Sequence, residues 1–544
     1  MSIEYKSCGC SFETNDKGLP IFNPNIISLP LDCSRTWDLI CDGNTKGVFQ
    51  LESYLGQSKS RDSQPRNIAE LADVISIIRP GCNDAVVDGK TLTQHYIDRK
   101  AKRDEVKYFH PTLEPILKNT YGILVYQEQA LAIAKELAGY SLSEAEILRK
   151  AIGKKDIELM TKVKSEFADK AVEHGILTRA DAVEIFSWIE KSQKYSFNAS
   201  HAVAYALNAY QTAYAKAHFP RAFFAAYIRH SGGKPKPFIE VNELVNNARI
   251  MDIDIRPPNI LNMIENCELI GGEPHFGLTN VKKVGKSVFK DIKKIIDEKG
   301  YDIASMTWDQ FLMKIGRYVK KDSFENMIAA GAFDCYKISR NEMLYGLQLF
   351  IDLRDKDHND LEQTEQETFV GGLEEAAGKL LNQEKIGFHD RNRIELLQST
   401  ISSLLSPPFS LLDMPSWIAK KERELLGIEL TCTEIDEYDT LDANCTCREY
   451  IKGFSSNVIA IAAKISSVRE YAIKKGKNKG SLMAFIRIED GTCALEGLVC
   501  FSDDWEKNKK DAKEGAIVLV RGTRDKKNKE SFLVKKVQKL KQCI

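Results

Sequence analysis

Four cationic side chains lie close together around the end of one predicted helix. Ser141 and Glu144 have the spacing of a capping box, which predicts where this helix begins, and Gly153 is expected to end it. The cations are Arg149, Lys150, Lys154 and Lys155. The helix dipole accounts for some positive charge at a C-terminus, but four cations within seven residues exceed that need. They predict a site for a polyphosphate or a nucleic-acid backbone.

A second predicted helix, which extends from about residue 199 toward Pro220, has two chemically different faces. Asn198 or Ser200 is expected to cap it. We expect an apolar stripe of Val203, Leu207, Tyr210 and Tyr214, and an opposite polar stripe of His201, Tyr205, Asn208 and Thr212. The polar stripe could stack on nucleotide bases. The alternative, a core helix whose polar groups bond internally, is commoner for such a pattern, but the preceding cations favour the nucleotide-facing hypothesis.

Cysteines near the N-terminus are candidate metal ligands. Cys8 and Cys10 flank one glycine, and Cys33 and Cys41 follow. Four thiolates suit tetrahedral Zn²⁺, so a structural zinc site at these residues is one hypothesis. The alternative is unpaired reduced thiols. The odd total of 13 cysteines and an N-terminus without a signal-peptide core favour reduced thiols in a cytoplasm.

The elements that would position these groups change character along the chain. Residues 47–230 have mainly helical patterns, whereas residues 355–390 are acidic and poor in aromatics, which indicates a flexible segment. Five strands are predicted at 458–468, 482–489, 495–501, 516–520 and 532–537, with a hairpin signal at Asp490. The loop between the first two carries Lys475, Lys477 and Lys479. Phe485, Phe501 and Trp505 are possible stacking residues there; the alternative is a core position, which we prefer for Phe501.

Several long motifs, in one order, resemble the fingers of the bacterial replicative DNA polymerase III alpha subunit, a C-family DNA polymerase. They are GVFQLES (47–53), IIRPG (77–81), IDRK (97–100), YGILVYQEQ (121–129), RKAIGKK (149–155) and the block from 196 to 214. Residues 253–258 and 276–280 resemble the family's exit toward a helix-hairpin-helix module. Residues 424–429 resemble the approach to its OB domain.

The resemblance implies a multidomain chain that is mainly α in its fingers and helix-hairpin-helix parts, followed by a C-terminal OB β-barrel. The expected parts are an N-terminal segment with the cysteines and a palm edge (1–46), fingers (47–265), a helix-hairpin-helix domain (266–350), a flexible acidic insertion and linker (351–420) and the OB domain (421–544).

It also implies roles for individual residues. Arg149, Lys150, Lys154 and Lys155 would contact the triphosphate, and His201, Tyr205 and Asn208 would face the nascent base pair. Expected DNA contacts are Arg99 and Lys100, the hairpin lysines Lys282, Lys283 and Lys286, and the three loop lysines. In the family the hairpin carries a Gly-x-Gly turn; here Lys283 replaces the first glycine and only Gly285 remains.

No counterpart of the family's catalytic carboxylates is found in the sequence. Asp252 and Asp254 have suitable spacing, but their context matches the segment after the fingers. We therefore expect no catalytic residue here, with Mg²⁺ held mainly by a palm on a partner chain of a split DNA polymerase that extends a primer with dNTPs. The alternative is a non-catalytic DNA-binding protein derived from a C-family polymerase; an RNA-binding factor is a third, weaker hypothesis.

The overall composition says little about where the protein acts or what it binds. Lys plus Arg equals Asp plus Glu at 77 each, so any DNA affinity must come from local charge. No apolar run approaches the length of a membrane span, so no membrane contact is expected. The expected location is the cytoplasm of a bacterial cell, including one infected by a bacteriophage with split replication genes. No clamp-binding peptide aligns near residues 398–410, and sliding-clamp binding stays open.

Overall fold

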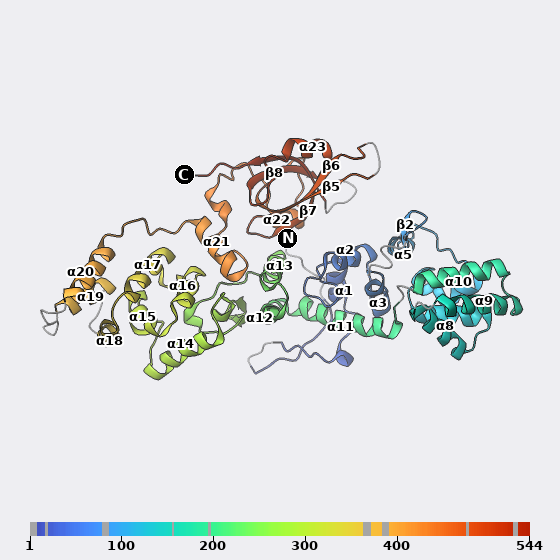
Figure 1. Ribbon diagram of the computed structural model, residues 1–544, viewed down its shortest axis with the longest axis horizontal. Coiled ribbons are helices and arrows are strands. Elements are labelled where there is room, and N and C mark those ends of the chain that lie inside the picture. The colour runs from blue at the N-terminus through green and yellow to red at the C-terminus, as the bar shows by residue number, and fades with distance from the viewer. Residues whose placement is uncertain are drawn as a thin grey trace. The chain divides into compact units, whose positions relative to one another are not determined.

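The chain divides after Pro220 into two compact units. The computed structural model describes residues 8–16, 20–78, 86–154, 157–193, 197–362, 372–382, 391–474, 478–525 and 531–543. Glu4–Pro220 form the first unit, and Arg221–Ile544 form most of the second (Figure 1). The expected end of the fingers at residue 265 therefore does not coincide with this division.

The first unit is almost entirely helical. Its α-helices are α1 (Ser34–Cys41), α2 (Tyr54–Ser63), α3 (Ile68–Ile77), α5 (Leu92–Lys100), α6 (Glu114–Leu117), α7 (Gln127–Ala138), α8 (Leu142–Lys154), α9 (Ile157–Glu173), α10 (Arg179–Gln193) and α11 (Ala199–His218). Short elements are the 3-10 helices η1 (Ile26–Ser28), η2 (Pro111–Leu113) and η3 (Lys118–Thr120) and the paired strands β1 (Val86–Val87) and β2 (Lys90–Thr91).

Helices α7 to α10 pack around a common apolar core that positions the cationic helix α8. Ile133, Phe167 and Phe186 are completely buried there. The predicted capping box is confirmed, because the Glu144 carboxylate accepts hydrogen bonds from the Ser141 amide and hydroxyl, both at 2.9 Å. The expected stop at Gly153 is wrong, since α8 continues through Lys154.

Helix α11 packs against α3, and its buried face combines alanines with Tyr210 and Tyr214, two members of the predicted apolar stripe. Asn198 caps it by accepting the His201 amide at 2.9 Å, as predicted. The buried side chains are Ala202, Ala206, Ala209, Tyr210, Ala213, Tyr214, Lys216 and Ala217. Val203 is instead 40% exposed. Small side chains allow two helix backbones to approach closely, so the alanine face takes the inner position.

The second unit begins with helices around two adjoining apolar cores. Its helices are α12 (Pro220–His230), α13 (Pro237–Ile250), α14 (Lys286–Lys299), α15 (Trp308–Ile315), α16 (Lys321–Ala329), α17 (Arg340–Ile351), α18 (Asp355–Glu362), α19 (Leu373–Leu381), α20 (Arg391–Leu405), α21 (Pro415–Leu426) and α22 (Cys447–Ile451). Between them lie η4 (Ser231–Gly233), η5 (Ile260–Asn262), η6 (Leu278–Asn280), η7 (Gly316–Tyr318), η8 (Asp334–Tyr336) and η9 (Glu434–Glu437), with the hairpin β3 (Glu268–Ile270) and β4 (Glu273–His275).

The segment 351–420 is not the loosely packed linker that its composition predicts, as far as the structure describes it. Leu361, Leu380 and Leu397, from α18, α19 and α20, are buried in the same core as Phe311 and Phe324. Apolar residues at helical spacing within an acidic background were sufficient to fold it.

The C-terminal part is a closed five-stranded barrel consistent with the expected OB fold. The strands are β5 (Ile459–Ala472), β6 (Leu482–Glu489), β7 (Ala494–Cys500), β8 (Ile517–Arg524) and β9 (Phe532–Lys539), in the order β5-β6-β7-β9-β8. Helix α23 (Ser502–Asn508) connects β7 to β8. The predicted turn after Asp490 is present, and Gly491 adopts φ +75° there, a conformation that glycine tolerates best. Alternating buried residues such as Ile486 and Ile488 fill the interior.

Candidate nucleic-acid interface

An aromatic cluster lies along the exposed face of α11. The His201 and Tyr205 rings are 4.0 Å apart, and Phe49 lies 5.1 Å from Tyr205 on its other side. Asn208 is exposed one turn further along, and its carbonyl accepts the Thr212 hydroxyl at 2.6 Å. His201 and Phe49 are exposed and Tyr205 is half-buried between them, and such a group of rings is suited to stacking on a base. Phe49 was not predicted as a site residue from the sequence, although it lies in the 47–53 motif.

The N-terminus of α11 is already satisfied by the protein. The Glu128 carboxylate accepts the Ala199 amide at 2.9 Å and the Asn198 side-chain amide at 2.6 Å. A carboxylate at this position complements the helix dipole and leaves no anion site at the helix start. The part of α11 available to a nucleotide is therefore its aromatic flank.

The cations of α8 are partly neutralised within their own helix. Arg149 donates from Nε and Nη2 to the Glu146 carboxylate at 2.9 and 2.7 Å, and this hydrogen bonding raises the pKa of Arg149. Lys150 is more exposed and lies 3.9 Å from Glu146. Lys154 is the last residue of α8, and Lys155 lies outside the described residues. A phosphate at this helix end would have to compete with Glu146.

Two other predicted DNA contacts are engaged inside the first unit. Arg99 donates from Nη1 to the Tyr121 carbonyl at 3.0 Å. The Lys100 ammonium, whose side chain is only 13% exposed, lies 2.8 Å from the Glu70 carboxylate and 3.1 Å from the Gln64 carbonyl. Both cations anchor α5 within the unit, so the Lys100 ammonium is largely inaccessible to DNA.

The hairpin before α14 keeps the backbone that its family-like sequence implies. Lys283 adopts φ +66°, the left-handed region that glycine favours, so a lysine occupies a glycine-type position. Gly285 then serves as the N-cap residue of α14 without a side chain to bond the first turn. Cross-bonds fix the turn: the Ser323 hydroxyl donates to the Lys283 carbonyl at 3.0 Å, and Asn326 to the Lys282 carbonyl at 2.9 Å.

The three lysines of this hairpin face solvent. The Lys283 ammonium lies 3.3 Å from the Asp322 carboxylate, and the Lys286 ammonium 3.2 Å from Glu265. These are exposed pairs of little stability, which a phosphate could replace. Lys282 is exposed as well. The charge predicted to substitute for the missing glycine is thus available at the turn.

The barrel presents aromatic rings to solvent near its basic loop. Phe485 is 39% and Phe501 is 46% exposed, so the preferred core position of Phe501 is wrong. Trp505 is buried and donates its Nε1 hydrogen to Glu470 at 2.9 Å, which excludes it as a stacking residue. Lys479 is exposed. Lys475 and Lys477 lie outside the described residues.

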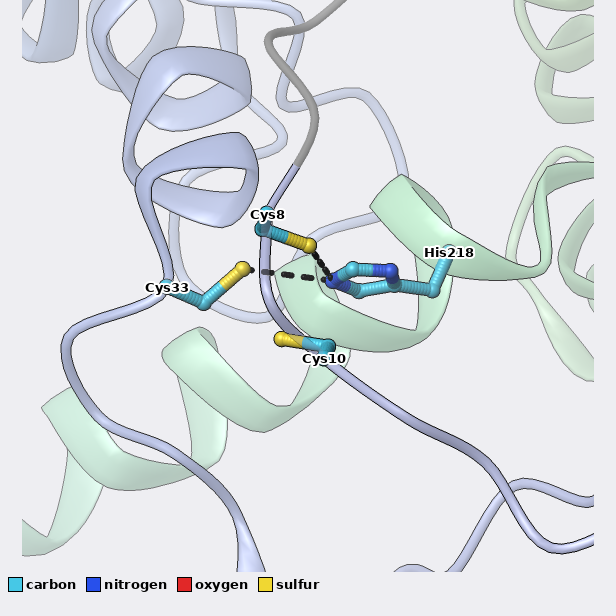
Figure 2. Close-up of side chains that lie close together, drawn as sticks. All are labelled: Cys8, Cys10, Cys33 and His218. Carbon is cyan, nitrogen blue, oxygen red and sulfur yellow. Dashed lines mark hydrogen bonds between the residues drawn. The ribbon is translucent and has the colours of Figure 1, made fainter.

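Three of the four predicted zinc ligands come together in the first unit, with a histidine in place of the fourth. Cys8, Cys10, Cys33 and His218 place one ligand atom each within 4.8 Å of one another (Figure 2). The prediction of Cys41 as a ligand is wrong. Its buried thiol donates to the Pro65 carbonyl at 3.1 Å, and burial raises its pKa to about 11.

The electrostatics of this group differ from residue to residue. Burial, assisted by the charge of Arg35, lowers the pKa of His218 to about 4, so the ring is neutral near pH 7. Burial raises the pKa of Cys10 to about 12. Burial also acts to raise the pKa of Cys8, but hydrogen bonds with Cys10 and Cys33 outweigh it and lower that pKa.

The Asp252 carboxylate is paired with cationic side chains. Asp252 pairs with the Lys452 ammonium and lies 3.7 Å from Arg448. Within the described residues, the cysteine and histidine group is the sole cluster with three or more possible metal ligands. Over the same residues, no helix is long and apolar enough to cross a membrane.

Comparisons with known proteins agree with this architecture. Residues 14–175 match the family model of the bacterial DNA polymerase III alpha subunit finger domain, and residues 252–343 match a helix-hairpin-helix motif. The DNA polymerase III subunit alpha of Aquifex aeolicus is 32% identical over 519 residues, which are 94% of this chain and 39% of that protein. That of Thermus aquaticus is 31% identical over 95% of this chain and 39% of its own length, and that of Chlamydia trachomatis 33% over 75% and 30%.

The fold and these matches define a chain of polymerase fingers, a helix-hairpin-helix module and an OB-like barrel. The chain is similar in sequence to the DNA polymerase III alpha subunit over most of its length, and its residues 14–175 match the model of that subunit's finger domain. It spans between 30% and 39% of the length of these three relatives.

Proposed function

We propose that this chain supplies the fingers and DNA-binding parts of a replicative DNA polymerase. The reaction served is the template-directed transfer of a dNMP from a dNTP to a primer 3′ end. The observation that carries the proposal is the aromatic face of α11, where half-buried Tyr205 lies between the exposed rings of His201 and Phe49 in a polymerase-like fingers unit. Such a face can pack on the nascent base pair.

Phosphoryl transfer depends mainly on positioning and on electrostatic stabilisation. Arg149 and Lys150 would hold the triphosphate, with Lys154 and Lys155 continuing the same cationic segment. Glu146 holds the Arg149 guanidinium by two hydrogen bonds, and the triphosphate would compete with this carboxylate for it. The fingers would then align the incoming base and its phosphates for attack by the primer.

In this proposal a partner chain carries the palm and its carboxylates. Two Mg²⁺ ions held mainly by that palm would activate the primer hydroxyl and stabilise the leaving pyrophosphate. Asp252 does not substitute for these carboxylates, because Lys452 and Arg448 neutralise it. The chain would act with this partner in a bacterial cytoplasm, including that of a phage-infected cell.

The second unit would hold the DNA on either side of the reaction. Lys282, Lys283 and Lys286 surround the turn before α14 and suit the phosphates of the primer–template duplex. The barrel, with Phe485 and Phe501 exposed, suits single-stranded template. Duplex and single strand would therefore contact different parts of this unit.

Primer extension with Mg²⁺ tests the proposal, using the purified chain and the same chain recovered with its partners from its native cells. We expect activity only in the recovered sample, where mass spectrometry should identify a palm-bearing chain. DNA binding without extension in either sample would favour the non-catalytic alternative. Extension by the chain alone would contradict the assignment of the carboxylates to a partner.

A further inference from the structure

Three cysteines and a histidine from distant parts of the first unit surround one point. Cys8 and Cys10 come from the N-terminal segment, Cys33 precedes α1, and His218 is the last residue of α11 (Figure 2). In Figure 2 their sulfur atoms and a ring nitrogen point toward a common centre. Cys8 and His218 are separated by 210 positions in the chain. Folding alone does not require four such side chains to converge.

The spacing of the ligand atoms matches a tetrahedral zinc site. Zn–S bonds of about 2.3 Å and Zn–N bonds of about 2.0 Å give edges between neighbouring ligands of about 3.5–3.8 Å. The Cys33 sulfur lies 3.3 Å from His218 Nε2, and the Cys8 sulfur 3.9 Å from the same nitrogen. These distances lie on either side of the tetrahedral edge, so small shifts would close the site on an ion.

The segment between Cys10 and Cys33 has little regular structure to hold it in place. Its described residues contain η1 and an isolated bridge between Thr14 and Pro20. It attaches to α11 by side chains: the Phe12 ring lies 5.2 Å from the ring of His218, and the Tyr210 hydroxyl donates to the Pro30 carbonyl at 2.6 Å. A segment with so few backbone hydrogen bonds gains much from a cross-link.

The surroundings of the group suit bound thiolates. The Tyr214 side chain is hydrogen-bonded to Cys10, the kind of outer contact that steadies a metal-bound sulfur. Arg35 acts electrostatically on both Cys8 and His218. Three thiolates and one Zn²⁺ leave a single negative charge, which Arg35 would balance.

We propose that Cys8, Cys10, Cys33 and His218 bind one structural Zn²⁺ ion that fastens the N-terminal segment to the end of α11. The protein supplies all four ligands, so no position is open for water or substrate, and the ion is structural. Binding releases the protons of the three thiols to solvent. Because α11 also carries His201 and Tyr205, the ion would fix the far end of the helix that bears the aromatic cluster.

Metal content of the full-length protein tests the site directly and does not depend on polymerase activity. The protein would be expressed with zinc supplied, freed of loose metal and analysed by plasma mass spectrometry. We expect about one zinc per chain in the wild type and in Cys41→Ser, whose thiol is buried outside the group. Cys10→Ser and His218→Ala should lose most of it. His218→Cys, which restores a fourth ligand, should keep it.

Two further readouts keep the test decisive if a variant folds poorly. Wild-type protein exchanged into cobalt should show the intense visible absorption of a tetrahedral cobalt–thiolate centre. Chelation should speed hydrogen exchange in residues 8–33 and leave α21 in the second unit unchanged. A wild-type protein without zinc or cobalt absorption would overturn the proposal, as would a Cys8–Cys10 disulfide in the purified chain. Equal zinc loss in Cys41→Ser and Cys10→Ser would overturn the assignment of ligands.

Discussion

Lys283 allows the backbone and the charge of the DNA-binding hairpin to be tested separately. Its φ of +66° costs an L-residue roughly 1–2 kcal/mol, a cost that glycine lacks and alanine keeps. The exposed ion pair with Asp322 adds at most about 1 kcal/mol, and less in salt. Thermal unfolding should therefore find Lys283→Gly about 1 kcal/mol more stable than Lys283→Ala, with the alanine variant close to wild type.

DNA binding should respond differently, because both variants lose the same charge. If the Lys283 ammonium neutralises one duplex phosphate, the slope of log K against log salt should fall by about 0.9 in both. Fluorescence anisotropy with a primer–template duplex over a salt series measures this slope. Lys337 is a matched control: it is an exposed lysine at φ +59° in another turn, so its glycine and alanine variants change the same properties.

Three results would refute this reasoning. An unchanged salt slope in both Lys283 variants would show that the charge does not contact DNA. Equal stability of the glycine and alanine variants would show that the left-handed backbone carries no strain. An equal loss of DNA binding in the Lys337 variants would show a general effect of net charge.

Three further perturbations have clear expected outcomes. Arg149→Ala should raise the KM for dNTPs of the assembled enzyme. Glu146→Ala frees Arg149 from its carboxylate and should lower this KM or leave it unchanged. Steady-state kinetics measure both values, and a KM that rises equally in the two variants would contradict the assignment of Arg149 to the triphosphate. Burial raises the pKa of Asp73 to about 6, above its ordinary 3.8. The folded protein therefore favours the protonated carboxyl, and the stability linked to this proton is full below about pH 4 and is lost as the pH rises through 6. Asp73→Asn should remove this pH dependence, which urea titrations at pH 5 and 7 of the variant and the wild type can check; a dependence of the same size in the variant would contradict the assignment to Asp73. Glu422→Ala removes one of the two carboxylates that pair with buried Arg340, at 2.8 Å, while Asp334 remains at 2.7 Å. It also leaves the Leu430 and Thr431 amides without their acceptor, so it should cost about 3–5 kcal/mol, seen as a lower Tm; a loss below about 1 kcal/mol would contradict this account.

Local patterns predicted much of the fold. The strands of the barrel follow period-two alternation, and Asn198 and Glu144 cap their helices by contacts within three residues, so neighbouring sequence contains the signal. The packed face of α11 was less accessible to prediction. Hydrophobicity alone predicts that Val203 is buried, whereas the close packing of α11 places alanines at most of the buried positions.

The parts of the site that depend on distant contacts could not be predicted. His218 lies 185 positions from Cys33, and a histidine in the last turn of a helix is ordinarily explained by the helix dipole. Cys41 lies closer in sequence to the other cysteines than His218 does, but its thiol donates to the Pro65 carbonyl and not to the cluster. Phe49 joins the α11 cluster only through the tertiary fold. The pairing of Arg149 with Glu146 has a local signal, since the residues are three apart, but the sequence argument counted only the cations.

The most direct test of the fingers assignment is the KM for dNTPs of the assembled enzyme with Tyr205→Ala. Tyr54→Ala is the matched control, because Tyr54 is a 68% exposed tyrosine of the same unit, outside the α11 cluster. Loss of one base-stacking contact of about 1–3 kcal/mol predicts a KM raised roughly 5- to 160-fold for Tyr205→Ala and unchanged for Tyr54→Ala. Equal KM values for wild type and Tyr205→Ala would contradict a role of this face in binding the nascent base pair.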